Sequence, residues 1–351
     1  MPITAIFINR DFAENFAAYS GAKHCIPCAN GTDALQIALM ALDLQPGDEV
    51  ITPSFTYIAT TEVMALLRLT PVFAEVDPKT FCLDAGSIEK LITSKTKAIV
   101  PVHLYGQAAP MEEIMAIAKK NNLYVIEDNA QATGCEYIFS DNTKKKTGTI
   151  GHIGTTSFYP SKNLGAFGDG GAIFTEDDAL ASKIKMIANH GQSKKYYHDV
   201  VGCNSRLDTI QAAILDIKLK HLEEYILARR KAADYYDEAF AVEKKIITPF
   251  RASYSHHVFH QYTLVLDGDK ELGSRRDGLN EFLATHKIPS MIYYPVPSHK
   301  QKMFDHFDVS STSLPLTDWL TKRVISLPMH TELDEEQLSF ITSKVLEYLK
   351  N

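Results

Sequence analysis

One lysine of the chain stands in a setting that suits covalent chemistry. Lys162 follows the β-rich run 155–159, lies among small residues, and precedes the glycine-rich run 168–171. A primary amine needs close, uncluttered access to condense with an aldehyde, and desolvation or a nearby cation keeps part of it deprotonated. A lysine in a loop is more often simply solvated, so this segment alone leaves both interpretations open.

A second segment has the features of a phosphate site. In NGTDAL at 30–35, Gly31 and Thr32 stand at the start of a predicted helix that runs to Leu42. Free backbone N–H groups and the positive end of the helix dipole favour an anion there, and the Thr32 hydroxyl adds a donor. Ordinary helix capping is the commoner explanation of such residues.

A third segment ends an apolar predicted strand, 123–126, with carboxylates. Ligands of open α/β sheets bind at the carboxyl ends of strands. Asp128 could pair there with a protonated ring nitrogen, a metal or a ribose, or simply end the strand. Taken together, however, a phosphate cradle, Asp128 and Lys162 supply what pyridoxal phosphate needs: a phosphate anchor, a pyridinium partner and an amine that forms a Schiff base.

The elements that must position these residues follow an α/β pattern. Short β-rich runs alternate with stretches whose apolar residues recur every three or four positions, as in helices that cover a sheet. The predicted strands are 49–52, 70–73, 97–102, 123–126, 155–159 and 171–175, and the predicted helices between them include 56–67, 84–92 and 110–121. This pattern predicts a mostly parallel sheet.

The C-terminal third has a different pattern, typical of a smaller α+β unit. The predicted elements are one or two long helices over 206–240, strands at 259–266 and 288–294, and helices at 273–286 and 334–348. We therefore expect a large cofactor-binding domain over residues 1–230 and a small C-terminal domain over residues 231–351.

Composition and charge exclude several classes of protein. The 351 residues are 45% hydrophobic and 23% charged, which is ordinary for a globular protein, and no apolar run is long enough to span a bilayer. A net charge of −7 gives no reason to bind nucleic acid, and the basic run 144–146 is interpreted as a solvated loop. The first ten residues lack the features of a secretion signal, so we expect a cytoplasmic protein without membrane or nucleic-acid partners.

Cysteine, histidine and glycine patterns indicate no metal and no nucleotide cofactor. Cys25 and Cys28 form a C-x-x-C pair, but the other three cysteines are scattered, so reduced thiols are expected rather than a metal site. The chain has no H-E-x-x-H, no G-x-G-x-x-G and no G-x-x-x-x-G-K-[ST] motif. A nicotinamide enzyme or a nucleoside-triphosphate enzyme is therefore disfavoured.

From about residue 12 to its C-terminus the chain resembles the DegT/DnrJ/EryC1/StrS family of sugar aminotransferases. The motifs that carry the resemblance are NGTDAL at 30–35, PSFTYIAT at 53–60, EDNAQ at 127–131, TSFYPSKNLG at 156–165, GDGGAIFT at 168–175 and NSRLDTIQAAIL at 204–215. The resemblance implies the α/β fold of aspartate aminotransferase, fold type I, with a mostly parallel seven-stranded sheet flanked by helices and a smaller α+β C-terminal domain.

The same resemblance implies roles for individual residues. Lys162 is expected to anchor pyridoxal 5'-phosphate, and Asp128 is expected to hold the pyridine nitrogen protonated. The other expected cofactor-binding residues are Gly31, Thr32 and Ser157 at the phosphate, Tyr57 on the ring face, Gln131 near the ring hydroxyl, and Asn204 from a neighbouring subunit. A site shared across a two-fold interface implies a homodimer.

In the implied reaction, glutamate leaves its amino group on the cofactor as pyridoxamine phosphate, and a nucleotide-linked keto sugar then collects it. Lys162 is the expected base for the proton shift between the substrate carbon and the cofactor carbon. Segments such as HGQ at 190–192 and SLPMH at 326–330 look closest to 3-aminotransferases of UDP-2-acetamido-2-deoxy-3-oxo-glucuronate, which serve surface polysaccharide and O-antigen biosynthesis.

Three residues are candidates for contacts with the sugar. Arg206 could grip a sugar carboxylate with two hydrogen bonds, or could form an ordinary surface pair. Tyr293 and Tyr294 occupy the place of the family's His-Tyr segment, which closes over the sugar from the other subunit, so Tyr293 replaces a histidine.

Three other functions share features with this sequence. Amino transfer to a dTDP-linked 3- or 4-keto-6-deoxy sugar is the alternative within the same reaction class. A sugar dehydratase of the family replaces the anchoring lysine, so Lys162 disfavours it. A regulator that keeps the fold without the chemistry is disfavoured because Lys162 and Asp128 are both retained.

Overall fold

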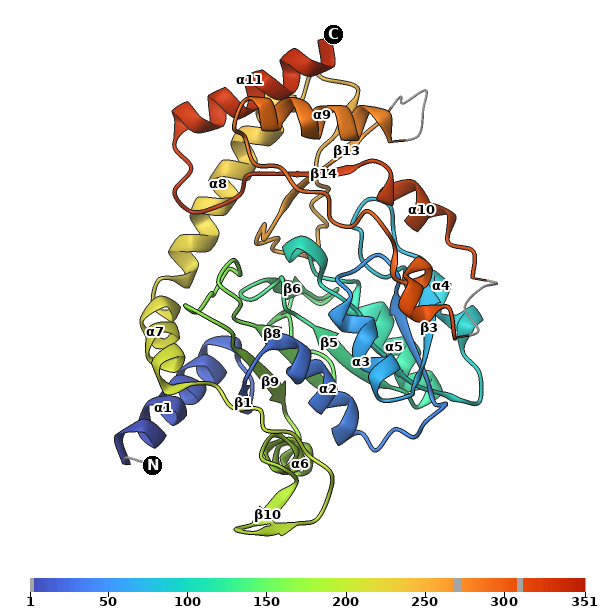
Figure 1. Cartoon of the computed structure of the whole chain (residues 1–351), viewed down its shortest axis with the longest axis vertical. Coiled ribbons are helices and arrows are strands. Elements are labelled where there is room, and N and C mark those ends of the chain that lie inside the picture. Colours follow the sequence, from blue (N-terminus) through green and yellow to red (C-terminus); the bar gives the residue numbers. More distant parts are fainter. Residues whose placement is uncertain (1–2, 268–272, 308–311, 351) are drawn as a thin grey trace.

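A seven-stranded sheet forms the centre of the computed structural model, which describes residues 3–267, 273–307 and 312–350 (Figure 1). In spatial order the strands are β1 (His24–Cys28), β9 (Gly171–Thr175), β8 (Ile153–Ser157), β5 (Tyr124–Asp128), β4 (Thr96–Ile99), β2 (Glu49–Pro53) and β3 (Thr70–Ala74). The pairs from β8 to β3 are parallel, and β9 runs antiparallel to β8 and β1. The predicted mostly parallel seven-stranded sheet is confirmed.

Successive residues of these strands contribute to two hydrophobic cores, one on each face of the sheet. In β2, Ile51 packs in the first core and Val50 in the second, and in β5 Val125 and Ile126 divide in the same way. The alternation follows from the pleat of a strand, in which neighbouring side chains point to opposite faces. Because both faces are buried, the strands are nearly continuous apolar runs in the sequence.

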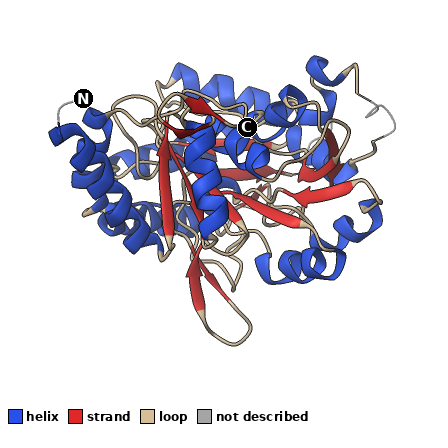
Figure 2. Ribbon diagram, turned by 90° about the horizontal axis from the view of Figure 1, so that it is seen from below, coloured by secondary structure: helices blue, strands red, loops and turns tan. Residues whose placement is uncertain are grey.

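Helices cover both faces of the sheet, as Figure 2 shows with helices in blue and strands in red. The first core includes side chains of α1 (Ile3–Ser20), α5 (Met111–Asn121) and α7 (Thr209–Leu219). The second core includes side chains of α2 (Gly31–Ala41), α3 (Ala59–Leu66) and α6 (Asp178–Ala188).

The long helix α8 (Leu222–Phe240) leads from the sheet to the C-terminal region (Figure 1). Leu222 and Ile226 pack in the first core, whereas Tyr236 and Phe240 pack in a third core. This third core is formed with the antiparallel strands β12 (Ile246–Ile247), β13 (Tyr262–Leu266) and β14 (Val324–Leu327), and with α9 (Ser274–Thr285) and α11 (Glu335–Lys350). The domain boundary between residues 230 and 231 falls within α8 and stays a prediction.

Short elements complete the described part of the chain. They are α4 (Ala85–Ile88), α10 (Pro315–Thr321), the 3-10 turns η1 (Glu89–Leu91), η2 (Leu104–Gly106), η3 (Ser298–Lys300) and η4 (Lys302–Phe304), and the hairpins β6 (Glu136–Ile138) with β7 (Lys144–Lys146) and β10 (Gln192–Lys194) with β11 (Tyr197–His198). Across residues 3–267, 273–307 and 312–350, none of the helices has the length and apolar character needed to cross a membrane.

Two local predictions are wrong. The basic run 144–146 is strand β7 rather than a loop, because its backbone pairs with β6 while Lys144 and Lys145 stay exposed to solvent. The segment 288–294 is not a strand, because only Met291 makes a bridge, to Ser326. Proline at 289 has no N–H to donate, which weakens any ladder at the start of that segment.

Candidate active site

Nine of the eleven predicted site residues gather at one edge of the sheet, where the parallel strands end. The loops that follow β2, β5 and β8 line a cleft of about 610 Å³. The residues predicted from the sequence that line it are Gly31, Thr32, Tyr57, Asp128, Gln131, Ser157, Lys162, Tyr293 and Tyr294. This position agrees with the general rule that open α/β sheets bind ligands at the carboxyl ends of their strands.

The N-terminus of α2 forms one end of the cleft. Asn30 caps the helix, and its side chain accepts a hydrogen bond from the amide of Asp33 at 2.8 Å. Gly31 and Thr32 are the first residues of the helix, so their N–H groups lack partners within it. A Cβ at Gly31 would come within 2.7 Å of the Cβ of Ser157, so only glycine lets α2 approach β8 this closely. Backbone amides at the start of a helix suit an anion.

Asp128 ends β5 with its carboxylate at the cleft. The residue is 5% exposed. Its Oδ2 accepts a hydrogen bond from Oγ1 of Thr60 at 2.7 Å, and its Oδ1 accepts one from the amide of Ala130 at 3.1 Å. These two donors orient the carboxylate without neutralising it. A fixed carboxylate of this kind favours the protonated form of a ring nitrogen placed beside it.

Glu127, the preceding residue, faces away from the cleft and is fully buried. Its carboxylate accepts hydrogen bonds from Nε2 of His103 at 2.8 Å and from the amides of Gly148, Ile150 and Gly151 at 2.8, 2.6 and 2.6 Å. Burial acts to raise the pKa of Glu127, but the hydrogen bonds from His103 and the amides hold it below its ordinary value. Glu127 therefore stabilises the end of β5 and does not reach the cleft.

Lys162 stands in the loop between β8 and β9, with its side chain partly open to the cleft. The surrounding protein removes most of the water that would hydrate its ammonium, so desolvation lowers the pKa of Lys162 from 10.5 to about 8, against the opposing effect of Asp128. A useful fraction of the amine is therefore neutral near neutral pH. The neutral amine is the form that attacks an aldehyde and accepts a proton.

A hydrogen-bond network ties the C-terminal region to the cleft. Gln131 accepts from the amide of Tyr105 at 2.8 Å and donates to the hydroxyl of Tyr294 at 3.0 Å, while the Tyr105 hydroxyl donates to the carbonyl of Tyr293. The ring of Tyr57, 57% exposed, lies 6.2 Å from that of Tyr294. Tyr293 and Tyr294 were expected to reach the sugar from another subunit, but both line the cleft of their own chain.

Two predicted site residues lie outside this cleft. Asn204 forms an isolated bridge with Asn189. Arg206 lines a separate cavity of about 520 Å³, together with Arg10, Lys23 and Lys185. Within a single chain, the structure therefore does not bring Asn204 and Arg206 to the residues around Lys162.

Sequence reasoning missed several residues of the site. Thr60 orients Asp128 without lining the cleft, and its place in the motif at 53–60, three residues after Tyr57, is a signal that could have found it. His260 and Asp169 line the cleft. Asp169 stands in the glycine-rich run after Lys162, whereas nothing in the local sequence marks His260.

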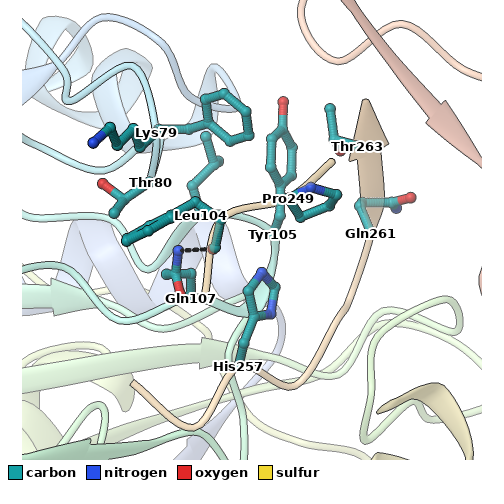
Figure 3. A pocket seen from close by; sticks show the side chains of 11 residues that line it. Lys79, Thr80, Leu104, Tyr105, Gln107, Pro249, His257, Gln261 and Thr263 are labelled. Atoms are coloured by element: carbon teal, nitrogen blue, oxygen red, sulfur yellow. Dashed lines mark hydrogen bonds between the residues drawn. The ribbon is translucent and has the colours of Figure 1, made fainter. Parts of the chain in front are cut away.

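A much smaller cavity, drawn in Figure 3, lies beside the cleft and shares Tyr105 and Gln261 with it. Its volume is about 10 Å³, room for no more than about one water molecule. His257 and Gln107 line it, and Gln107 donates to the carbonyl of Phe250 at 2.7 Å. This cavity is too small for a cofactor or a sugar.

The DegT/DnrJ/EryC1/StrS aminotransferase family matches residues 7–346, and the chain belongs to this family. It is 47% identical to a "pleiotropic regulatory protein" of Geobacillus stearothermophilus, over 96% of this chain and 88% of that protein. It is 46% identical to UDP-N-acetyl-3-dehydro-alpha-D-glucosamine 3-aminotransferase of Acidithiobacillus ferrooxidans, with 94% and 85% covered. It is also 46% identical to UDP-2-acetamido-2-deoxy-3-oxo-D-glucuronate aminotransferase of Pseudomonas aeruginosa, with 94% and 88% covered.

Two solved structures of similar proteins have the same fold as this chain. A DegT/DnrJ/EryC1/StrS aminotransferase from Brucella abortus, 39% identical, superposes with a TM-score of 0.89 over 97% of this chain and 90% of its own. NtdA from Bacillus subtilis, solved with bound cofactor PMP, is 30% identical, with a TM-score of 0.88 over 98% and 77% of the two chains. The chain is a pyridoxal-phosphate-dependent sugar aminotransferase, and the predicted fold type I, family and cofactor are confirmed.

The cleft itself fits this cofactor. The amides at the start of α2, where a Cβ at Gly31 would collide with Ser157, suit a phosphate. The fixed carboxylate of Asp128 suits a pyridinium nitrogen, and the partly desolvated amine of Lys162 suits an aldehyde. These three features line one cavity.

Proposed function

We propose that this enzyme transfers an amino group from glutamate to C3 of UDP-2-acetamido-2-deoxy-3-oxo-glucuronate. The observation that carries the proposal is the presence of Lys162, Asp128 and the N-terminus of α2 in a single cleft. Two relatives at 46% identity, each matched over most of both chains, are named for amino transfer to UDP-linked 3-oxo sugars, and one of those sugars is the glucuronate.

The residues of the cleft bind and orient the cofactor. Pyridoxal phosphate, when bound, supplies a carbonyl carbon that carries amino groups and a ring that withdraws electrons. Asp128 holds a proton on the ring nitrogen. The remaining cofactor-binding residues are Gly31, Thr32 and Ser157 at the phosphate, Tyr57 at the ring face and Gln131 at the ring hydroxyl, with Asn204 supplied by a second copy of the chain.

Lys162 has two tasks at the reacting atoms. Its neutral amine anchors the cofactor, and once released it takes a proton at Nζ and returns it. A pKa of about 8 suits both directions of transfer near neutral pH, because neither protonation state is strongly disfavoured.

Charge in the cleft supports a homodimer with shared sites. Among the described residues that line it, Lys162 is the cation, while Asp128 and Asp169 are anions. Glutamate and a nucleotide-linked uronate are both anionic, so their binding needs further positive charge. Arg206 faces a cavity outside the cleft of its own chain. In a two-fold dimer it reaches the neighbouring cleft, as Asn204 does, and grips the sugar carboxylate with two hydrogen bonds.

The domains and the cellular setting follow from the same proposal. Residues 1–230 form the domain that binds the cofactor, and residues 231–351 form the domain that brings Tyr293 and Tyr294 to the sugar. A nucleotide-sugar substrate places the reaction in the cytoplasm, where it serves the synthesis of a surface polysaccharide such as O-antigen. The partners of the enzyme are its substrates and a second copy of the chain.

A comparison of three keto sugars as amino acceptors tests which substrate the enzyme prefers. Purified enzyme with glutamate is offered UDP-2-acetamido-3-oxo-glucuronate, its uncharged 3-oxo-glucose counterpart and a dTDP-3-keto-6-deoxy sugar. We expect kcat/KM for the uronate to be the highest by at least tenfold, the factor that about 1.4 kcal/mol of carboxylate binding gives. Preference for the dTDP sugar, a class named for a relative at 42% identity, contradicts the proposal.

Two variants test the roles of Arg206 and Lys162 in that experiment. Arg206→Met should abolish the preference for the uronate over its uncharged counterpart while leaving turnover of the uncharged sugar. Lys162→Ala should abolish turnover of every sugar. If the wild-type protein binds the cofactor but transfers no amino group, the chain acts as a regulator, the role for which the Geobacillus relative is named.

A further inference from the structure

His260 is a buried residue of the cleft that takes no part in the roles assigned so far. It precedes β13, lines the cleft with Lys162, and is 5% exposed. Its Nδ1 is buried and has no hydrogen-bond partner among the residues that the structure describes. Buried ring nitrogens in native proteins are nearly always hydrogen-bonded. An unpartnered one at a ligand site therefore indicates a partner that moves or arrives during the reaction.

The backbone around His260 is held in place relative to the lysine loop. The Nη1 of Arg229 donates to the carbonyl of His260 at 3.4 Å. Asn163, the residue after Lys162, donates from Nδ2 to the carbonyl of Val258 at 3.1 Å. The segment with His260 and the loop with Lys162 are thus tied together, so the ring keeps its position at the cleft while the flexible lysine side chain moves.

The electrostatic surroundings keep the His260 ring neutral. Burial, followed by the positive charges of Lys162 in the cleft and Arg229 on α8, lowers the pKa of His260 far below its ordinary value of 6.5. A neutral imidazole keeps one nitrogen lone pair, which accepts a hydrogen bond from an ammonium without taking its proton. Asp128, whose charge also acts on Lys162, already accepts hydrogen bonds from Thr60 and from a backbone amide.

We propose that His260 is a positioning residue for Lys162: its neutral ring accepts a hydrogen bond from the lysine amine whenever the cofactor does not engage that amine. The proton that Nζ of Lys162 takes up then stays on Nζ, and the amine stays at the reacting atoms instead of turning to solvent. This inference rests on the proposed role of Lys162 as the cofactor anchor.

The test measures the protonation of Lys162 in the apoenzyme. Acetic anhydride labels the neutral amine, and mass spectrometry of the Lys162 peptide gives the extent of labelling across the pH range. For the wild type we expect a midpoint at about pH 8. His260→Leu removes the acceptor, so the ammonium is less stable and the midpoint should fall by roughly one pH unit. His260→Gln keeps a side-chain acceptor and should restore the wild-type midpoint.

His257 offers a matched control on the same segment. It is 4% exposed, its Nδ1 accepts from the amide of Phe259 at 3.0 Å, and it lines the small cavity of Figure 3 instead of the cleft. His257→Leu should leave the Lys162 midpoint unchanged. If His260→Leu causes no shift, or if both leucine variants cause the same shift, His260 does not position Lys162.

A second variant and a measurement on the wild type test the proposal if His260→Leu does not fold. If His260→Leu does not fold, His260→Phe takes its place, because a benzyl side chain is close in shape to the imidazole and also lacks an acceptor. In the wild-type apoenzyme, NMR of labelled histidines should show the His260 ring neutral at about pH 6, below the ordinary histidine pKa. A charged ring at that pH would overturn the proposal.

Cofactor protection separates this inference from the proposed function. Pyridoxal phosphate added to the wild type should protect Lys162 from the label. Absence of protection would reject Lys162 as the cofactor anchor. Protection combined with an unshifted midpoint in His260→Leu would reject only the role of His260.

Discussion

Glu127 and Asp128 are consecutive residues of β5, and their carboxylates face opposite sides of the sheet. Glu127 accepts four hydrogen bonds within the protein, and Asp128 accepts two and faces the cleft. The pleat of the strand produces this division. One carboxylate stabilises the strand end, which leaves the other at a fixed position for chemistry.

Loss of the Thr60 hydroxyl should impair catalysis through Asp128. Thr60→Val removes a hydrogen bond of 2.7 Å to the carboxylate. A hydrogen bond to a charged group contributes about 1.5–3 kcal/mol, so kcat/KM for the glutamate half-reaction should fall by roughly 10- to 100-fold. Thr61→Val is the control, because Thr61 is equally buried but donates to the carbonyl of Ile58. Equal losses in the two variants would contradict this role of Thr60.

A methyl group at Gly31 should weaken cofactor binding. Its Cβ would lie 2.7 Å from the Cβ of Ser157, so α2 must shift away from β8. Overpacking of this kind costs about 1–3 kcal/mol, which corresponds to a rise in the Kd of pyridoxal phosphate of roughly 5- to 100-fold. Gly86→Ala is the control, since the nearest atom to its Cβ is 3.5 Å away. An unchanged Kd in Gly31→Ala would show that the α2 terminus does not hold the phosphate.

The apoenzyme should become more stable at neutral pH when Lys162 is replaced by methionine. The folded-state pKa of Lys162 is about 8, against 10.5 in an unhindered lysine. Below pH 8 the folded state bears the full penalty of holding a desolvated ammonium. Between those two pKa values the unfolded chain binds more protons than the folded one, so wild-type stability rises with pH.

The expected gain for Lys162→Met at neutral pH is about 1–2 kcal/mol, reduced from the full shift because the side chain is partly open to solvent. The gain should shrink as the pH approaches 10.5. Thermal unfolding of the apoenzyme at several pH values measures it, with Lys145→Met on the exposed strand β7 as a control. A gain independent of pH would mean that desolvation of the amine is not its cause.

Glu127→Gln should destabilise the protein and change how its free energy of unfolding depends on pH in acid. The pKa of Glu127 is held below its ordinary 4.5, so its contribution to stability is complete above that value and is lost as the pH falls through the lower folded-state pKa. Breaking a buried pair costs about 3–5 kcal/mol, and urea unfolding at neutral pH should show a loss of that order.

The same variant should also have a flatter dependence of stability on pH below 4.5. Glu113→Gln, on the exposed side of α5, should show neither change. An acid profile of Glu127→Gln that matches the wild type would contradict the assigned hydrogen bonds.

Several features of this protein were predictable because they are local in the sequence. The strands of the central sheet appear as apolar runs bounded by turns, and helices such as α5 and α7 have apolar residues at helical spacing. The glycine that begins α2, the carboxylate that ends β5 and the lysine after β8 can be recognised from their neighbours alone, because strand ends and helix starts are defined by short segments.

Other features depend on contacts between distant segments, and only the tertiary structure decides them. His260 is 98 positions from Lys162 in the numbering, yet both line one cleft, and Tyr294 meets Gln131 across a separation of 163 residues. Arg206 faces a different cavity although its motif is as recognisable as the others. Which side chains face one another depends on how the sheet, α8 and the C-terminal region pack, and no local pattern of residues contains that information.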